Sequence, residues 1–495
     1  GIVVDLSRHL NRILWIDPQA RKVRVQAGVV KDQLNAELAK VGLFFAPELS
    51  TSNRATIGGM INTDASGQGS CTYGKTRDHV LSLDVVLLGG ERFESQALSA
   101  AGLQAHMHRP GRIGETYRTA YQVATTEQAL IEKHFPKLNR CLTGYDLAHF
   151  WEADGRFNLN SILCGSEGSL GFIVEAELHV LPIPIHTALV NIRYAGFMDA
   201  LRDARALMAH QPLSIETVDS KVLLLAMEDI VWSKVAEFFP ENDEGVQTRG
   251  INLVEFCGDD PQDVDARVKA FVEHLHSDTS AQRLGCTVAV GHEAVERVYT
   301  MRKRSVGLLG NVQGEIRPQP FVEDTAVPPE KLPEYIAEFR ELLDGLGLSY
   351  GMFGHVDAGV LHVRPALDLK DPAHAAMIRV ISDAVADLTQ KHGGLIWGEH
   401  GKGVRSEYVP KFFGPLYPAL QSIKAAFDPR NQLNPGKIAT PAGKLDAELL
   451  KVDGVPLRAD SDRMINERVW ESYGTAMHCN GNGACYNFDP NDAMC

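Results

Sequence analysis

Residues 56–67 read Thr56-Ile57-Gly58-Gly59-Met60-Ile61-Asn62-Thr63-Asp64-Ala65-Ser66-Gly67. The adjacent glycines Gly58 and Gly59 permit backbone conformations that other residues avoid, and they let a second group come close to the main chain. Backbone N–H groups exposed in such a segment can bind a pyrophosphate. An ordinary glycine turn between two strands is the alternative interpretation of this stretch taken alone.

A second glycine-rich stretch reads Cys164-Gly165-Ser166-Glu167-Gly168-Ser169-Leu170-Gly171 and precedes an extended run that starts at Phe172. Neither stretch is a Gly-x-Gly-x-x-Gly motif after a strand, and neither is a phosphate-binding P-loop. The sequence therefore disfavours a nicotinamide-binding Rossmann domain and an ATPase.

The composition is that of a globular protein, with 495 residues, 44% hydrophobic and 23% charged. A chain of this length has room for about two to four domains and a large core. The net charge of −14 disfavours a nucleic-acid partner. No apolar stretch reaches the roughly 18 residues that a transmembrane span needs, and peripheral membrane association stays open.

The strand-like and helical patterns divide the chain near Pro182 and Pro184, since proline interrupts both kinds of element. Residues 1–185 are rich in short strands and glycine, with helices predicted at 31–41 and about 114–134. Residues 186–440 alternate strands with amphipathic helices, which predicts an α+β domain whose sheet is covered by helices on one face. The helices are expected at about 198–209, 261–276, 329–346 and 371–391. Residues 441–478 are polar and resemble a connector.

Histidine and carboxylate residues are concentrated in two segments of the second domain. His355 and His362 flank Val356-Asp357-Ala358-Gly359, and Glu399 precedes His400. Two imidazoles and a carboxylate form a ligand set for a transition metal, and the further histidine is a candidate base. In one unbroken strand, residues seven apart would lie roughly 23 Å apart on opposite faces. The intervening residues predict a hairpin turn that brings both rings to one sheet face, and two ordinary histidines beside a turn are the alternative.

The eight cysteines fall into two groups. Five occur singly in apolar or strand-like contexts, which is typical of buried free thiols in a reducing compartment. These are Cys71, Cys141, Cys164, Cys257 and Cys286. The other three, Cys479, Cys485 and Cys495, are clustered at the end of the chain. Because the chain starts at Gly1 and stops within this cysteine-containing stretch, we expect a fragment cut at both ends.

Several motifs in order resemble the FAD-binding domain of the vanillyl-alcohol-oxidase type, also called the PCMH type. The first group is Pro47 with Thr56-Ile57-Gly58-Gly59, Tyr73-Gly74, Arg77-Asp78 and Val85-Val86-Leu87. The stretch Gly165–Gly171 is similar to the second flavin segment of that family. The closing motif of that family's substrate domain is resembled by two stretches, Phe427-Asp428-Pro429 and Asn434-Pro435-Gly436-Lys437-Ile438. The resemblance covers residues 1–440.

This resemblance implies an α+β protein, with a partial PCMH-type FAD-binding domain at 1–185 and a ferredoxin-like α+β substrate domain at 186–440. It assigns FAD contacts to Pro47, Thr56, Ile57, Gly58, Gly59, Asn62, Thr63, Ser66, Gly67, Gly165, Glu167, Gly168, Gly171, Ile173 and Asn434. A first flavin subdomain with another glycine-rich loop would lie upstream of Gly1. We therefore expect the flavin site of this chain to be incomplete.

Within that family, the segments that contain the histidines match the D-2-hydroxyacid dehydrogenases. The match implies a divalent metal, zinc or manganese, on His355, His362 and Glu399, with His400 as the base. It also implies that Arg302 binds a substrate carboxylate, and Arg317 and Arg364 are candidates for further positive charge, since arginine binds carboxylates bidentately. Two positions depart from the family pattern, because Val322 stands where a substrate-binding lysine is expected and Arg364 where asparagine is usual.

The end of the chain, His478-Cys479-Asn480-Gly481-Asn482-Gly483-Ala484-Cys485, resembles the start of a ferredoxin-type cluster motif. Asn482 occupies the place of the second cysteine, and further ligands to a cluster, expected to be 4Fe-4S, would lie beyond Cys495. Residues 479–495 would then begin a truncated iron–sulfur-binding domain. A tail with three chance cysteines is the alternative. The whole pattern is similar to bacterial D-2-hydroxyglutarate dehydrogenases that carry flavin and iron–sulfur domains.

We therefore expect an FAD-dependent, metal-assisted oxidation of a D-2-hydroxy acid, with D-2-hydroxyglutarate as the predicted substrate and 2-oxoglutarate as the product. Electrons would pass from the flavin to the iron–sulfur domain and on to a quinone or a carrier protein. D-lactate or another D-2-hydroxy acid is an alternative substrate. A flavin-free, metal-dependent hydrolase and a binding module with a structural metal are alternatives of other classes. We expect a cytoplasmic protein, and association with the inner membrane or into a homo-oligomer is compatible with the sequence.

Overall fold

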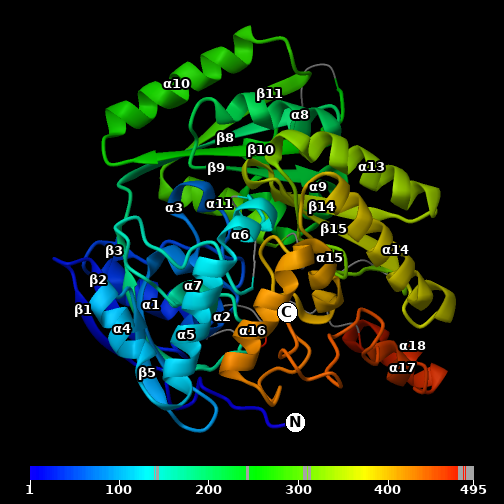
Figure 1. The fold of residues 1–495 in the computed structure, drawn as a ribbon. Helices are drawn as coiled ribbons and strands as arrows, with labels where there is room; N and C mark the ends of the chain where they lie inside the picture. Colours follow the sequence, from blue (N-terminus) through cyan, green and yellow to red (C-terminus); the bar gives the residue numbers. More distant parts are fainter. Residues whose placement is uncertain are drawn as a thin grey trace.

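The structure is a computed structural model that describes residues 1–138, 140, 144–240, 245–304, 309, 314–477, 483 and 485. Two bodies lie side by side, each built around an antiparallel sheet (Figure 1). The first sheet has five strands and the second has eight. A short pair, β3 (Leu43–Phe44) and β7 (Leu181–Pro182), lies outside both sheets.

The first sheet has the strand order β1-β2-β6-β4-β5. Its strands are β1 (Ile13–Asp17), β2 (Lys22–Gln26), β4 (Val80–Val86), β5 (Arg92–Gln96) and β6 (Phe172–His179). One face is apolar and packs on helices, as where Phe93 of β5 meets Tyr117 edge to face. The other face carries ion pairs, including Arg24 with Glu94 and with Glu175, each at 3.0 Å. The period-two alternation of apolar and charged residues thus sets which face is covered.

The helices of the first body are α1 (Lys31–Ala39), α2 (Ile57–Asn62), α3 (Ser70–Tyr73), α4 (Ala100–Met107), α5 (Gly111–Thr126), α6 (Gln128–His134) and α7 (Asn160–Leu163). The helix predicted at 31–41 is confirmed, and the one at 114–134 divides into α5 and α6. The stretch 57–62 is a short helix rather than a turn between strands. Thr56 caps it by accepting a hydrogen bond from the Gly59 N–H at 3.2 Å.

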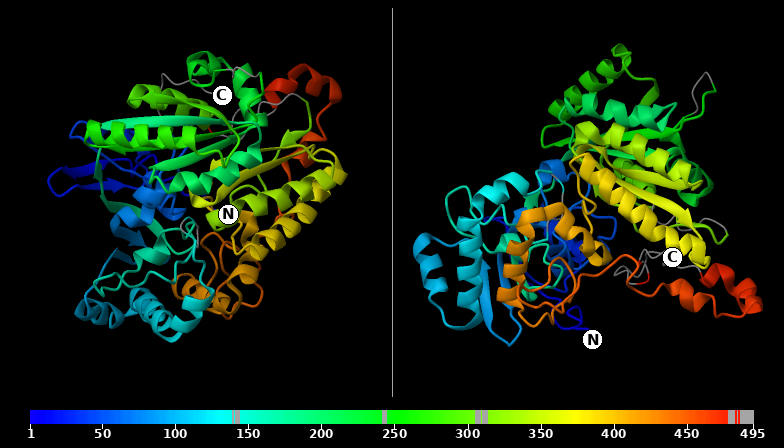
Figure 2. Two further views of the ribbon diagram at one scale, coloured as in Figure 1. Left: turned by 90° about the horizontal axis from the view of Figure 1, so that it is seen from above. Right: turned by 45° about the vertical axis from the view of Figure 1, so that its right-hand side comes forward.

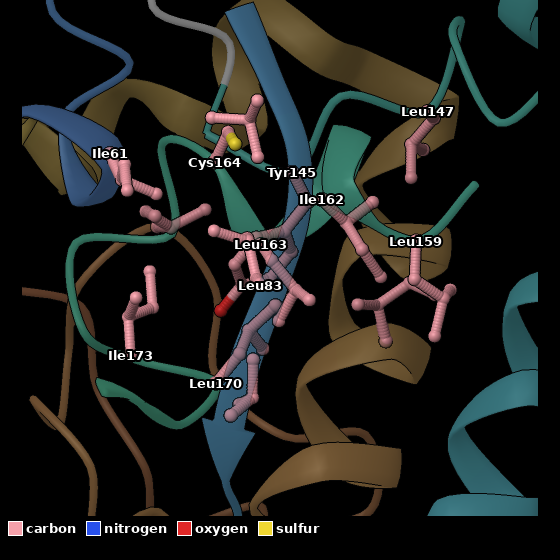
Figure 3. Close-up of a cluster of buried hydrophobic side chains, with 14 of the residues drawn as sticks. Ile61, Leu83, Tyr145, Leu147, Leu159, Ile162, Leu163, Cys164, Leu170 and Ile173 are labelled. Atoms are coloured by element: carbon pink, nitrogen blue, oxygen red, sulfur yellow. The ribbon is translucent and has the colours of Figure 1, made fainter. Parts of the chain in front are cut away.

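The two glycine-rich stretches are held together by backbone hydrogen bonds. The Gly165 N–H donates to the Ile61 carbonyl, and the Glu167 N–H donates to the Asn62 carbonyl, each at 2.8 Å. Glu167 has φ +52, which a tight turn imposes on it. Figure 3 shows the apolar side chains of this region, among them Ile61, Leu83 and Leu170, gathered around β4. Burial of Ile61 in this core anchors the first glycine-rich stretch to the sheet.

The second sheet has the strand order β11-β8-β10-β9-β14-β15-β12, with β13 paired to β15. Its strands are β8 (His186–Tyr194), β9 (Ser214–Asp219), β10 (Gly250–Gly258), β11 (Arg283–Val290), β12 (Arg317–Pro318), β13 (Thr325–Ala326), β14 (Tyr350–His355) and β15 (Val360–Leu367). One face is covered by α8 (Phe197–Met208), α10 (Pro261–Ser277), α13 (Leu332–Gly345) and α14 (Pro372–Lys391). Each of these helices was predicted.

The opposite face is covered as well, by α9 (Ser220–Glu228) and α11 (His292–Lys303). The prediction of helices on one face only is therefore wrong. The physical reason lies in the strands, because neighbouring residues such as Leu189 and Val190 of β8 point to opposite faces and are both fully buried.

The chain returns to the first body after the second sheet. Helix α16 (Tyr417–Phe427) packs against α5, where the orange segment in Figure 2 meets the first body. Phe413, the last residue of α15 (Val409–Phe413), packs edge to face on Phe135, which follows α6. The predicted segment 186–440 thus contributes to both bodies in space. The last helices are α17 (Arg458–Asp462) and α18 (Glu467–Met477). Among the described helices, none combines the length and the apolar character needed to cross a membrane.

The contact between α16 and the second glycine-rich stretch is centred on Lys424, whose side chain is fully buried. Its Nζ donates to Asp428 Oδ2 at 2.7 Å and to the carbonyls of Ser169 and Leu433 at 2.8 Å each. Burial lowers the pKa of Lys424, and the Asp428 carboxylate opposes that effect. The buried ion pair is therefore satisfied only when both partners and both carbonyls are in place.

We expect Lys424→Met to destabilise the first body by about 3–5 kcal/mol, because it leaves the Asp428 carboxylate buried without its cation. Chemical denaturation followed by circular dichroism measures the change. The matched control is Lys451→Met, since Lys451 makes an exposed ion pair with Glu448. Equal stability of the two variants would contradict the prediction.

Candidate active site

A cavity of about 430 Å³ lies where the two bodies meet. Its first wall comes from residues 48–68, and its second wall comes from the second sheet and the segment around His400. The lining residues are Glu48, Leu49, Ser50, Thr51, Ala55, Thr56, Gly59, Met60, Thr63, Ala65, Ser66, Gly67, Gln68, Glu216, Arg302, Lys303, Phe353, His355, His362, Arg364, Glu399, His400 and Gly401.

The predicted hairpin between the two histidines is confirmed. Strand β14 ends at His355, a single 3₁₀ turn covers Val356–Ala358, and β15 begins at Val360. Gly359 has φ +70, and a Cβ at this position would lie 1.9 Å from the Val327 carbonyl oxygen, so the turn requires glycine. Phe353 is paired with His362 across the hairpin, which brings the two imidazole rings within 5.8 Å.

Three possible metal donors converge in the cavity. His355 Nε2 lies 2.9 Å from Glu399 Oε1, and His362 Nε2 lies 3.8 Å from Glu399 Oε2. One ligand atom from each of the three residues lies within 4.8 Å of the other two. His362 Nδ1 is buried and has no hydrogen-bond partner among the described residues. Two imidazole nitrogens and one carboxylate oxygen suit zinc or manganese, so these residues fit the predicted ion.

Two of the three predicted donors, His362 and Glu399, are in the protonation state of a metal ligand. Burial lowers the pKa of His362 well below its ordinary value, so that ring is neutral and able to act as a ligand. Burial alone would raise the pKa of Glu399, but the charges of His355 and Arg140 outweigh it and hold that pKa well below its usual range. Ionised carboxylate and neutral imidazole are the forms that bind a metal. Burial alone would lower the pKa of His355, but the carboxylates of Glu216 and Glu399 raise it above its ordinary value, so this ring must release a proton when a metal binds.

Arg140 is a site residue that the sequence did not indicate. Its guanidinium is almost fully buried, with Nη1 2.5 Å from Glu399 Oε1 and Nε donating to Ser70 Oγ at 2.7 Å. The arginine belongs to the first body and the glutamate to the second. This ion pair therefore joins the bodies at a carboxylate that is a predicted metal ligand.

His400 lies at the edge of the cavity, with its side chain 50% exposed and its ring stacked on His362 at 5.4 Å. Asp324, which is fully buried, accepts hydrogen bonds from the N–H groups of Glu399 at 2.7 Å and of His400 at 2.9 Å. Burial would lower the pKa of His400, but the nearby carboxylates of Asp324 and Glu323 raise it above its ordinary value. These features suit a proton acceptor.

Positive charge lines the end of the cavity near Phe353. The guanidinium of Arg302 lies 4.7 Å from the centre of that ring, and the guanidinium of Arg364 lies 5.9 Å from it. Arg302 Nη2 is 2.9 Å from Glu216 Oε2, and Arg364 Nε donates to Glu323 Oε2 at 2.6 Å. Arg317 is not among the lining residues, because β12 pairs with the far end of β15, at Leu367.

Five of the residues predicted to contact FAD line the cavity, and the others lie outside its lining. The five are Thr56, Gly59, Thr63, Ser66 and Gly67. A Cβ on Gly59 would have only Thr56 Oγ1 within 4 Å, so the backbone is open there, and the small side chains of this wall suit a flat ring system.

The predicted residues outside the lining are Ile57, Gly58, Asn62, Gly165, Glu167, Gly168, Gly171, Ile173, Asn434 and Pro47, the last of which directly precedes the lining residue Glu48. Among them, Glu167 accepts hydrogen bonds from the N–H groups of Lys402 at 2.6 Å and Gly403 at 3.2 Å. It thereby ties the second glycine-rich stretch to the chain that follows His400.

The sequence also did not single out Glu48, Ser50, Thr51, Glu216, Lys303 and Phe353, which line the cavity. Of these residues, only Glu216 could have been noticed in the sequence, because it is a charged residue within the strand-like run Ser214-Ile215-Glu216-Thr217-Val218. Among the predicted cluster ligands, Cys479 and Cys495 lie outside the described residues, and Cys485 is an exposed free cysteine.

Comparison with known proteins gives matches over most of the chain. Residues 183–438 match the C-terminal domain of FAD linked oxidases, and residues 1–95 match an FAD binding domain. The D-2-hydroxyglutarate dehydrogenase of Pseudomonas putida is 71% identical over 495 residues, which is 100% of this chain and 49% of that protein. The enzyme of that name from Escherichia coli is 54% identical over 500 residues, again 100% of this chain and 49% of that protein. The chain thus spans about half the length of these curated relatives.

The crystal structure of p-cresol methylhydroxylase with substrate bound is similar in fold, with a TM-score of 0.59 and 14% identity. The match covers 87% of this chain and 78% of that chain. Together with the two domain matches, it confirms the predicted α+β class and the PCMH-type FAD-binding domain. Because one family match alone covers more than half of the sequence, the chain belongs to the FAD-linked oxidases, with an FAD-binding domain followed by that family's C-terminal domain.

Proposed function

We propose that this chain forms the flavin and substrate part of a D-2-hydroxyglutarate dehydrogenase that produces 2-oxoglutarate. The observation that carries the proposal is the convergence of His355, His362 and Glu399, beside His400, on a cavity whose opposite wall is the glycine-rich flavin segment. The high identity to relatives of that name supports the substrate.

The two groups that complete the site are FAD and a divalent metal, zinc or manganese, held by His355, His362 and Glu399. The chemistry that they supply when bound is acceptance of a hydride by the flavin and a lower pKa of the substrate hydroxyl beside the metal. The chain itself binds and orients the hydroxy acid and moves the hydroxyl proton.

His400 is the residue that accepts this proton. Its ring stacks on the ligand His362, which keeps it beside the metal-binding atoms, and Asp324 fixes its backbone. The neighbouring carboxylates raise its pKa, so the neutral ring is a stronger base than an ordinary histidine.

Arg302 and Arg364 recognise the carboxylate at the far end of a dicarboxylate substrate. Both face Phe353 on the same cavity wall, where planar guanidinium groups can bind a carboxylate bidentately. Arg364 supplies positive charge in a site where Val322, fully apolar and buried, replaces the lysine expected from the family. Arg317 was also predicted from the sequence to bind the substrate, but it does not line the cavity, so we do not assign it this role.

Beyond the flavin, we propose that electrons leave through an iron–sulfur domain that starts at Cys479, Cys485 and Cys495 and that passes them to a quinone or a carrier protein. The unpaired thiols Cys71, Cys164, Cys257 and Cys286 support a reducing compartment, the cytoplasm.

D-lactate is the alternative substrate. Turnover of D-lactate at a rate equal to that of D-2-hydroxyglutarate would contradict the assigned substrate.

Removal of the metal is expected to abolish oxidation of D-2-hydroxyglutarate, because the hydroxyl then loses its polarising ion. Purified flavin-loaded protein is treated with a chelator and assayed by reduction of an artificial dye, and Zn²⁺ or Mn²⁺ is then added back. Recovery of activity after the ion is added back shows that the chelator inactivated the protein by removing its metal. Full activity of metal-free protein would reject the metal, and a protein without flavin absorbance that hydrolyses substrates would favour the hydrolase.

The variant His400→Gln is expected to lower kcat by about 10²- to 10⁴-fold, since it removes the proton acceptor. Steady-state kinetics with D-2-hydroxyglutarate measure this, and metal content by elemental analysis should stay unchanged. The control is His392→Gln, because His392 contacts Glu338 away from the cavity. A kcat near that of the control would exclude His400 as the base.

A further inference from the structure

Glu216 is a buried carboxylate in the middle of the second sheet. It lies in β9, between β10 and β14, and is paired with His355 of the neighbouring strand. The residue is 1% exposed, and every other residue of β9 is buried as well. A carboxylate in such a place is costly unless strong partners compensate the loss of water. The identity of its partners therefore indicates what it does.

The two oxygens of Glu216 contact two different functional groups. Oε1 contacts His355 Nδ1, and Oε2 lies 2.9 Å from Arg302 Nη2. His355 is a proposed metal ligand, and Arg302 is a proposed contact of the substrate carboxylate. One side chain thus touches both the metal end and the substrate end of the cavity, which it also lines.

A second buried glutamate in the same sheet gives the contrast. Glu255 of β10 accepts hydrogen bonds from Gln68 at 2.7 Å, Tyr299 at 2.9 Å and Thr187 at 3.1 Å, all of them neutral groups. It does not line the cavity. Glu255 therefore shows how this sheet accommodates a carboxylate that has a structural role alone, and the charged partners of Glu216 differ from that pattern.

The contact with His355 Nδ1 has a chemical consequence. A carboxylate only accepts hydrogen bonds, so the contact keeps a proton on Nδ1 and leaves Nε2, which lies beside Glu399, as the ring nitrogen that can bind a metal. The contact with Arg302 Nη2 holds the guanidinium beside Phe353, where Arg302 lines the cavity.

We propose that Glu216 is a positioning residue that orients His355 for the metal and Arg302 for the substrate carboxylate, and so makes metal retention and dicarboxylate recognition depend on one side chain. This inference rests on the proposed function, because it concerns the same site. Glu216 acts through His355 and Arg302 and has no catalytic role of its own in this proposal.

Glu216→Gln tests the proposal with little change in volume. An amide has one accepting end and one donating end, so it cannot accept from His355 and Arg302 at once. We expect the dissociation constant for Zn²⁺ or Mn²⁺ to rise about 10- to 100-fold, the usual effect of losing such a partner. We also expect the KM for D-2-hydroxyglutarate to rise by a larger factor than the KM for D-lactate, which lacks the second carboxylate.

The metal measurement uses purified protein without substrate, titrated with Zn²⁺ or Mn²⁺ against a chelating dye of known affinity. Glu255→Gln is the matched control, since it makes the same replacement at a buried carboxylate of the adjacent strand, and its metal affinity should equal that of the wild type. Should Glu216→Gln fail to fold, Glu216→Asp keeps the charge but is one methylene shorter, and it is expected to lose the contact with His355, with Arg302 or with both.

The outcomes separate the two proposals. Wild-type protein that retains no metal would overturn the proposed function. Wild-type protein that retains the metal, together with a Glu216→Gln or Glu216→Asp variant of equal affinity and unchanged KM values, would overturn the role of Glu216 alone. A loss of metal affinity that is as large in Glu255→Gln would also overturn it, because the effect would then follow from any buried carboxylate of the sheet.

Discussion

The ion pair between Arg140 and Glu399 is the contact on which the rest of the site depends. It joins the first body to the second at Glu399, which lines the cavity, and both side chains are nearly excluded from water. In such surroundings an unpaired carboxylate would take up a proton. The charges of His355 and Arg140 together hold the pKa of Glu399 well below its usual range, and both histidines lie close to its oxygens. The charge that a metal requires is thus supplied by the packing of one body on the other.

A small set of buried carboxylates organises the remaining functional groups of the second body. Glu216 contacts His355 and Arg302, whereas Glu323 contacts Arg364 and faces His400. Asp324 holds the backbone at Glu399 and His400 by two hydrogen bonds. Glu216 and Asp324 each contact a predicted metal ligand together with a neighbouring group, and Glu323 links Arg364 with His400. Such a network restricts the rotamers of the functional side chains before substrate arrives, and preorganisation of this kind lowers the cost of binding.

The sequence predicted the elements better than their packing. The hairpin at Val356–Gly359 and four helices of the second domain, α8, α10, α13 and α14, were predicted because turn chemistry and amphipathic spacing are local properties. The second helical layer over the sheet was not predicted, because strands that are buried on both faces show no alternation of apolar and polar residues. The packing of residues 409–427 on the first body also has no local signal, since it depends on contacts with residues that are far away in the sequence.

By itself, the sequence determined the chemistry available at the site: two histidines across a turn, a glutamate next to a third histidine, and glycines where a ligand can approach the backbone. These follow from residue type and short spacing, which the chain keeps in any fold. The tertiary structure alone decided that Arg140 meets Glu399, that Glu216 faces His355, and that Arg317 is left outside the cavity. Such contacts join residues far apart in sequence, so they are set by strand register and by the docking of two bodies.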